Sequence, residues 1–178
     1  MKTVMTTTGR QRRALVLSAL ISMLSGCERP QARLAGAAPE SRASSDGAKR
    51  LSSASFRALM QTVADGWNQN DAQRAVDCFT DDARYSSPPN PRIRSGRAAL
   101  YEFFGGPEGR PRPMRMEWHH LLFDEESQIG AGEYTFEYGI RTHGLVIVRI
   151  VTGKIANWRE YEHESPLPWN ELVAGNSF

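Results

Sequence analysis

The fold of this protein is decided by residues 143–165, HGLVIVRIVTGKIANWREYEHES. Residues 145–151 form a nearly continuous apolar run, as expected for a strand that is covered on both faces. The sequence Thr152-Gly153-Lys154 then predicts a tight turn into a second strand. Because side chains alternate along a strand, Trp158 and Glu160 are expected to share one face of it. The stretch therefore predicts an antiparallel hairpin that carries a carboxylate beside an indole.

A further strand is predicted over residues 132–139, GEYTFEYG, with a turn at residues 143–144. One face of this strand carries the three aromatic residues, and the other carries Glu133, Thr135 and Glu137. If the acidic face lines a cavity, two or three carboxylates converge with Glu160. If the aromatic face does, the acids are solvated. Hydrophobicity favours the second arrangement, and the residues alone leave both open.

Helical periodicity precedes the strands. Apolar residues recur at helical spacing from Phe56 to Trp67, after a possible serine cap. Asp71 suggests the cap of a second, short helix, and residues 95–96 open a third. Helices followed by antiparallel strands predict an α+β domain.

The first 26 residues have the pattern of a secretory signal: basic residues, no acid, and an apolar run at residues 14–24. That run is shorter than the roughly 20 residues of a membrane-spanning helix. It ends in LSGC, residues 24–27, which resembles the bacterial lipobox. The resemblance implies cleavage before Cys27 and lipid attachment to it. We therefore expect anchoring in the bacterial cell envelope, at the outer membrane facing the periplasm. An ordinary signal peptide with a chance cysteine is the alternative.

The remaining chain divides into a linker and one domain. Residues 27–51 are rich in Ala, Ser, Arg and Gly and lack aromatic residues, so they predict a flexible tether, and residues 52–178 predict a single domain. Removing the four basic residues of the signal takes the formal net charge from +2 to −2. This balance gives no case for nucleic-acid binding. Cysteine and histidine spacing predicts no metal site, Cys78 is expected to be buried and inert, and no cofactor is expected.

Several segments together resemble a known family. They are WNQND at residues 67–71, FTDDARY at 79–85, SGR at 95–97, EYTFEY at 133–138 and the closing stretch. In order and spacing they are similar to the SnoaL-like branch of the nuclear transport factor 2-like superfamily. The resemblance implies a cone-shaped, curved antiparallel sheet packed on three N-terminal helices and enclosing a pocket. It also implies a homodimer formed through the sheet.

The superfamily includes several activities, which we compared residue by residue. Ketosteroid isomerases need a carboxylate base and an acidic oxyanion donor, and the corresponding positions hold Ser87 and Val146. We therefore do not expect that activity. Polyketide cyclases of the SnoaL type use an Asp and a His, which no histidine here matches clearly. The pair His119-His120 is expected to place one ring on each face of a strand, so at most one reaches the pocket.

Limonene-1,2-epoxide hydrolases are more similar in the last strand. Their Trp-Arg-Asp-Tyr run corresponds to residues 158–161, where Glu160 keeps the carboxylate. Tyr85 corresponds to their water-binding tyrosine. This resemblance favours Glu137 inside the pocket, but Glu137 and Gly139 occupy the positions of the family's Arg and second Asp. The catalytic triad is therefore incomplete.

We expect a pocket for a small apolar or amphipathic molecule, with Glu160 as a general acid or base and Tyr85 as its orienting partner. Burial beside an indole would raise the pKa of Glu160. The expected ligand-binding residues are Trp67, Trp118, His119, Glu137 and Trp158. Residues 110–113 suggest a loop that either gates the mouth or is a plain solvated connection, and the second is favoured. The alternative to ligand binding is a structural or interaction module whose pocket is filled by side chains.

Overall fold

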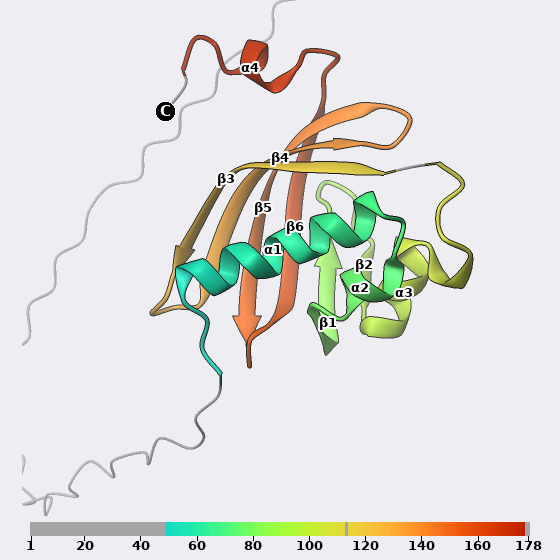
Figure 1. Cartoon of the computed structure of the whole chain (residues 1–178), viewed down its shortest axis with the longest axis vertical. Coiled ribbons are helices and arrows are strands. Elements are labelled where there is room, and N and C mark those ends of the chain that lie inside the picture. Colours follow the sequence, from blue (N-terminus) through green and yellow to red (C-terminus); the bar gives the residue numbers. More distant parts are fainter. Residues whose placement is uncertain (1–48, 113, 177–178) are drawn as a thin grey trace, which may run out of the picture. The chain divides into compact units, whose positions relative to one another are not determined.

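The computed structural model describes residues 49–112 and 114–176 (Figure 1). The expected signal peptide, Cys27 and most of the expected linker lie outside these residues. In the described part of the chain, no helix is both long enough and apolar enough to cross a membrane. The elements are α1 (Ser53–Asn68), α2 (Ala72–Val76), β1 (Phe79–Ser86), β2 (Ile93–Ser95), α3 (Arg97–Phe104), the 3₁₀ helix η1 (Gly106–Glu108), β3 (Arg115–Asp124), β4 (Ile129–Glu137), β5 (Arg141–Val151), β6 (Lys154–Glu164) and α4 (Trp169–Leu172).

The strands form one sheet in the order β2-β1-β6-β5-β4-β3. The prediction of an α+β fold is confirmed, but the sheet is mixed rather than antiparallel, because β1 pairs with β6 in parallel. Strands β3 to β6 follow one another through short turns, which require antiparallel pairing. The β1–β2 hairpin is separated from strands β3 to β6 along the chain by α3 and η1, so no tight turn joins β1 to β6 and their pairing can be parallel.

Helix α1 packs across one face of the sheet, here called the inner face; the opposite face is the outer face (Figure 1). Ser52 caps the helix by accepting a hydrogen bond from the Ser55 amide. The predicted apolar stripe is buried, beginning with Phe56 and ending with Trp67. Phe56 lies directly over Gly130 of β4, where a Cβ atom would be only 2.2 Å from its ring. Helix and sheet therefore approach closely because the sheet has no side chain there.

The β5–β6 hairpin confirms the turn at residues 152–154, with Thr152 and Gly153 both at positive φ. Two details of the prediction are wrong. Residues 143–144 lie inside β5, because Gly144 serves a close packing contact instead of a turn. Strand β5 is also not covered on both faces, since Leu145 on the outer face is 42% exposed.

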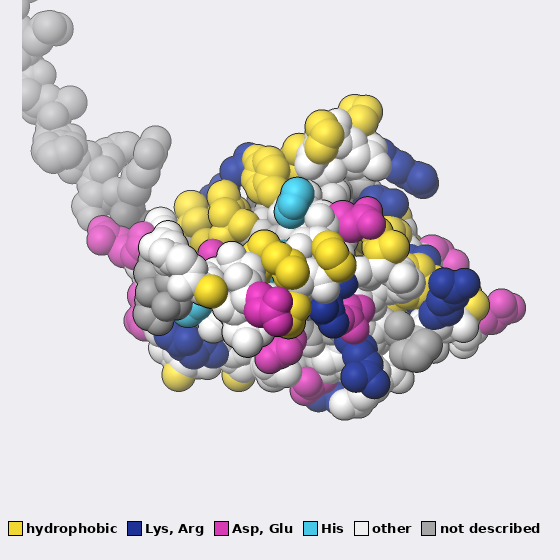
Figure 2. All heavy atoms as spheres, turned by 90° about the horizontal axis from the view of Figure 1, so that it is seen from above, with side chains coloured by type: hydrophobic (Ala, Val, Ile, Leu, Met, Phe, Trp, Pro, Cys, Tyr) yellow, Lys and Arg dark blue, Asp and Glu magenta, His cyan; other side chains and the backbone are white. Residues whose placement is uncertain are grey.

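The chain after β6 returns to the outer face, which the sequence did not predict. The Trp169 ring of α4 stacks on His119 of β3, with ring centroids 4.1 Å apart. His119 Nε2 lies 2.7 Å from the Thr135 hydroxyl, and that hydroxyl lies 2.9 Å from His143 Nδ1. His143 Nε2 in turn lies 2.9 Å from the Leu167 carbonyl. Seen from the end where α4 lies, exposed hydrophobic side chains gather around a histidine (Figure 2).

Candidate functional site

A cavity of about 310 Å³ lies between the inner face of the sheet and the helices. Its walls are mostly aromatic, and its polar groups are two carboxylates, one guanidinium and tyrosine hydroxyls. It is lined by Trp67, Tyr85, Phe103, Phe104, Arg110, Met114, Tyr134, Phe136, Tyr138, Glu160 and Glu162. Such a volume is at the lower end of the usual range for small-molecule sites, about 300–1,000 Å³.

Glu160 of β6 supplies the buried carboxyl of this cavity and is only 7% exposed. The Tyr85 hydroxyl donates a hydrogen bond of 2.6 Å to its Oε1. The Trp158 indole donates one of 2.7 Å to its Oε2, and the Tyr134 hydroxyl lies 3.3 Å from the same oxygen. The expected shared face of Trp158 and Glu160 is confirmed. All three donors are neutral, so the carboxyl group is held in place without an ion pair.

The pKa of Glu160 is raised from its ordinary value of 4.5 to about 7. Burial is the largest cause, because it disfavours the charged carboxylate. The hydrogen bond from Tyr85 lowers the pKa, the nearby charge of Glu162 raises it, and the bonds from Trp158 and Tyr134 lower it. A pKa near neutrality leaves both protonation states populated, which suits a general acid or base.

Tyr85 of β1 is buried and positioned by the parallel pairing of β1 with β6, in which it stands opposite Trp158. The two rings are stacked with centroids 5.7 Å apart. Burial and the neighbouring Glu160 raise the pKa of Tyr85 well above its usual value, so its hydroxyl stays protonated and donates. The predicted pair of Tyr85 and Glu160 is therefore in direct contact, 75 residues apart in sequence.

Tyr134 and Glu162 belong to the same group; the sequence analysis left the face of Tyr134 open and did not include Glu162. The Tyr134 hydroxyl lies 3.4 Å from Glu162 Oε1, and the Thr142 hydroxyl donates to that oxygen at 3.2 Å. Gly144 makes room for the Tyr134 hydroxyl, because a Cβ atom at Gly144 would be 2.5 Å from that oxygen. Glu162 is exposed yet lines the cavity. The alternation of positions 158, 160 and 162 along β6 was the signal that pointed to it.

The three expected tryptophans lie at different depths. Trp67 lines the cavity. Trp158 is buried beneath Glu160, to which its indole donates. Trp118 lies farther along the inner face, where its indole donates to the Met60 carbonyl at 3.0 Å and its ring packs edge-on against Tyr134. It therefore supports the wall that carries Tyr134.

The structure resolves the face of β4 that the sequence left open. The aromatic residues line the cavity, and Glu137 lies on the outer face, where it pairs with Arg141 at 2.6 Å. The expectation that Glu137 faces the pocket is therefore wrong. Burying three aromatic side chains is favourable, whereas burying the alternate carboxylates would carry a desolvation cost.

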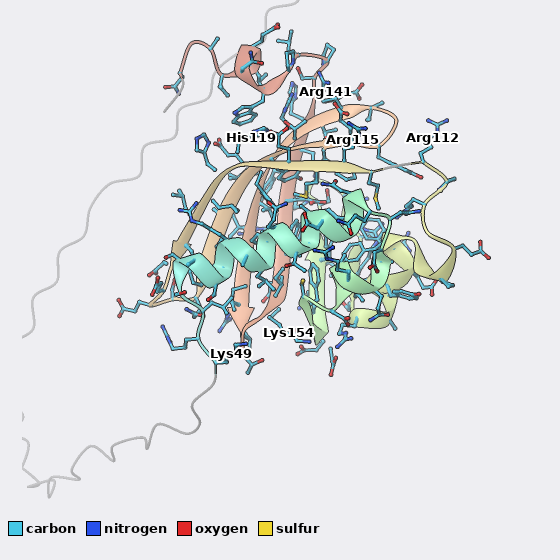
Figure 3. The ribbon with its side chains drawn as sticks, in the orientation of Figure 1. Lys49, Arg112, Arg115, His119, Arg141 and Lys154 are labelled. Atoms are coloured by element: carbon cyan, nitrogen blue, oxygen red, sulfur yellow. The ribbon has the colours of Figure 1, made fainter. Side chains whose placement is uncertain are left out.

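His119 also lies on the outer face, on the side of β3 that is turned away from α1 (Figure 3). The β3–β4 register shifts between Trp118 and His120, which is a β-bulge. Because of the bulge, His119 and His120 both contact outer-face residues: His119 contacts Thr135, and His120 Nδ1 lies 2.8 Å from Glu133. The predicted alternation of the two rings is wrong for this reason, because the bulge keeps His120 on the same face as His119. The placing of His119 in the pocket is also wrong, because alternation from the inner-face residue Trp118 already points His119 outward.

Arg110 is a lining residue that the sequence analysis treated as part of a solvated connection. Its guanidinium lies 5.4 Å from the Phe103 ring and 5.6 Å from the Tyr138 ring. The loop after η1 therefore closes one edge of the cavity. In the residues that the structure describes, no group of three or more His, Cys, Asp or Glu side chains could hold a metal ion. Cys78 is buried, and burial raises the pKa of its thiol to about 11.

Comparison with known families gives a match over residues 60–158, more than half of the chain, to the SnoaL-like domain. The chain belongs to the SnoaL-like domain family. No curated protein matches this SnoaL-like chain.

Solved structures share the fold of this SnoaL-like domain. An NTF-2 like protein of unknown function from Burkholderia xenovorans is 17% identical, with a TM-score of 0.55 over 70% of this chain and 94% of its own. The epoxide hydrolase/cyclase-like enzyme SalBIII is 20% identical, with a TM-score of 0.52 over 60% and 89%. An epoxide hydrolase of M. tuberculosis is 16% identical, with a TM-score of 0.50 over 62% and 84%. At these identities the likeness establishes the fold alone.

Proposed function

We propose that this SnoaL-like domain binds a small apolar or amphipathic molecule in its cavity, and that Glu160 acts on it as a cofactor-free general acid or base. The reaction class is isomerisation, cyclisation or hydration. One observation carries the proposal: a buried carboxyl, held by neutral donors, faces an aromatic cavity of about 310 Å³. Such a group exchanges protons near neutral pH without a metal or cofactor.

The chemical step follows from the geometry of this group. Ionised Glu160 takes a proton from a carbon beside a carbonyl; the C–H bond breaks, an O–H bond forms on the carboxyl, and the electron pair stays on the substrate as an enolate. Returning the proton to another carbon completes an isomerisation. Tyr85 keeps its own proton and orients the carboxyl through the 2.6 Å hydrogen bond.

Tyr134 offers a route for that proton to reach solvent. Its hydroxyl lies between Glu160 Oε2 and Glu162 Oε1, and Glu162 is exposed. Burial raises the pKa of Tyr134 far above neutrality, so it does not ionise by itself. We propose a concerted transfer in which Tyr134 accepts the proton of Glu160 as it gives its own to Glu162. The tyrosine stays neutral throughout.

The second carboxylate and the arginine also support a hydration or cyclisation reaction. At residues 137 and 139 this chain lacks the arginine and the second carboxylate of the epoxide-hydrolase pattern. Glu162 of β6 and Arg110 of the loop after η1 nevertheless line the same cavity. SalBIII is described as epoxide hydrolase/cyclase-like and as acting in pyran ring formation. Ketosteroid isomerisation has no such support, because Val146 is a buried apolar residue.

The test measures proton exchange on a simple bicyclic ketone, 2-tetralone. In D₂O, proton NMR would follow deuterium entering the carbons beside the carbonyl. We expect catalysed exchange whose rate rises with pH through about 7, and a loss of about 100-fold or more in Glu160→Gln. Glu117→Gln, an exposed carboxylate on β3, is the matched control and should leave the rate unchanged. Wild-type exchange no faster than buffer, or an unaffected Glu160→Gln variant, would contradict the proposal.

A non-catalytic role as a dimerising module is the second candidate. It is favoured by the exposed apolar side chains of the outer face, among them Leu145 and Tyr161, which is 44% exposed. Light scattering after size exclusion should report a dimer for the described domain and a monomer for the Leu145→Glu, Tyr161→Glu double variant. A wild-type monomer at micromolar concentration would rule out this interface.

Lipid attachment at Cys27 remains a proposal from the sequence. It would hold the domain at the bacterial outer membrane, facing the periplasm, through the linker of residues 27–51. The Cys27→Ser variant should leave the membrane fraction and appear in the soluble fraction. A variant that stays membrane-bound would contradict lipid anchoring at this residue.

A further inference from the structure

Two arginine side chains converge on one ring at the edge of the cavity. The Arg94 Cζ of β2 lies 3.5 Å from the centroid of the Phe103 ring, and the Arg110 Cζ lies 5.4 Å from the same centroid. Phe103 and Arg110 both line the cavity, and Tyr85 packs edge-on against Phe103. Arg110 comes from the segment between η1 and β3 that also carries Arg112 (Figure 3). Two cations from separate elements, β2 and the segment after η1, therefore lie beside the same ring.

Within the described part of the chain, neither guanidinium forms an ion pair. Within residues 49–112 and 114–176, neither side chain donates a hydrogen bond or forms an ion pair, and Arg110 Nε is buried without an acceptor. Other arginines of the domain do pair: Arg97 contacts Asp77 and Asp81. The arrangement of Arg94 and Arg110 is therefore not the usual one for a surface arginine near acids.

Arg94 is partly buried and lies near other cations. Burial lowers its pKa, and the charges of Arg92 and Arg110 lower it further. Tyr85 and Glu160 act in the opposite direction, but they rank below burial and Arg92. Two like charges held near one another and partly out of water are costly, and an anion between them removes that cost.

We propose that Arg94 and Arg110 form a carboxylate-binding subsite at the mouth of the cavity, so that the ligand is an amphipathic organic acid. Its acidic group binds the two guanidiniums beside Phe103, and its apolar body enters the aromatic cavity toward Glu160. Arginine suits this task because its planar fork of donors matches the two oxygens of a carboxylate. The inference rests on the cavity being a ligand site, as proposed above, but not on catalysis by Glu160.

The test compares two ligands of nearly equal shape, 2-naphthoate and its uncharged methyl ester. Titration calorimetry at about pH 8 and low salt should give an affinity for the acid at least about tenfold higher than for the ester. Arg94→Met and Arg110→Met should each reduce the affinity for the acid about fivefold or more and leave that for the ester unchanged. Methionine keeps an apolar contact with Phe103 and removes the charge and the guanidinium donors that would bind the carboxylate. Arg159→Met, which removes the same charge from an exposed position on β6, is the control and should change neither affinity.

Salt gives a second readout that needs no variant. Raising NaCl from about 50 to about 500 mM should weaken binding of the acid and leave the ester unaffected. Equal affinities for the two ligands in the wild-type protein, or equal losses for both in the arginine variants, would overturn the subsite. If acid selectivity holds while Glu160→Gln leaves proton exchange unchanged, the catalytic proposal alone fails. If Glu160→Gln abolishes proton exchange while the acid binds no better than the ester, only the subsite proposal fails.

Discussion

Both faces of strands β4 to β6 carry carboxyl groups, but the two groups differ in their partners and in their exposure to water. On the inner face, Glu160 is surrounded by neutral donors, and its pKa is raised to about 7. On the outer face, two residues past Thr135, Glu137 is half-exposed and pairs with the cation Arg141. The type of partner and the access to water, rather than the carboxyl group itself, set the pKa of each acid and so decide which one exchanges protons near neutral pH.

The largest expected effect is the contribution of Glu160 to the pH dependence of stability. Between about pH 4.5 and about pH 7 the folded protein retains the Glu160 proton, whereas the unfolded chain releases it. The folded state then binds more protons, so its contribution to the free energy of unfolding falls as the pH rises, by up to about 3 kcal/mol. Urea denaturation across this range should show the fall in the wild-type protein, relative to a flatter Glu160→Gln variant.

Glu137→Gln is the control for that comparison. The variant should keep the wild-type fall in stability between about pH 4.5 and about pH 7. If Glu160→Gln and Glu137→Gln show the same profile, the contrast between the two faces is wrong.

The next effect is steric and tests how Tyr134 reaches the carboxyl groups. A Cβ atom at Gly144 would lie 2.4 Å from Tyr134 Cζ, so Gly144→Ala must displace the ring. We expect a loss of about 1–3 kcal/mol in the free energy of unfolding. Thermal denaturation measures it, with Gly175→Ala as control, because no atom lies within 4 Å of a Cβ there. Equal stability of the two variants would mean that Tyr134 does not pack over β5 as described.

A smaller effect is expected from Tyr85→Phe. The hydroxyl donates to Glu160 and favours its ionised form, so its removal should raise the pKa of Glu160 further, by about one unit. Carbon NMR of labelled glutamate carboxyls can follow the titration directly. The stack of the ring on Trp158 is retained by phenylalanine, so the fold should persist. A lowered or unchanged pKa would show that this hydrogen bond does not stabilise the carboxylate.

The smallest effect is expected on the outer face. Trp169→Ala removes the ring that stacks on His119 and should cost about 1 kcal/mol or less, mainly by loosening α4. Hydrogen exchange should report faster exchange in α4 and unchanged protection in β6. A shift of the Glu160 pKa in this variant would mean that the two faces of the sheet are coupled.

The sequence alone predicted the main helices, the β5–β6 turn and the Trp158–Glu160 part of the site. The apolar stripe of α1, the turn at residues 152–154 and the shared face of Trp158 and Glu160 follow from local periodicity and were predicted correctly. The order of motifs was sufficient to identify the SnoaL-like family. These features depend on spacing within one segment, which a sequence displays directly.

Only the tertiary structure decided which distant side chains meet. The parallel pairing of β1 with β6 sets Tyr85 against Glu160, and the bulge in β3 turns His120 to the outer face beside His119. Gly144 admits the Tyr134 hydroxyl, and the loop after η1 brings Arg110 to the cavity. Each depends on strand register, on a missing side chain or on the path of a loop. A shift of one residue in register reverses the face that a side chain occupies, and which distant strands pair depends on tertiary packing rather than on spacing within one segment.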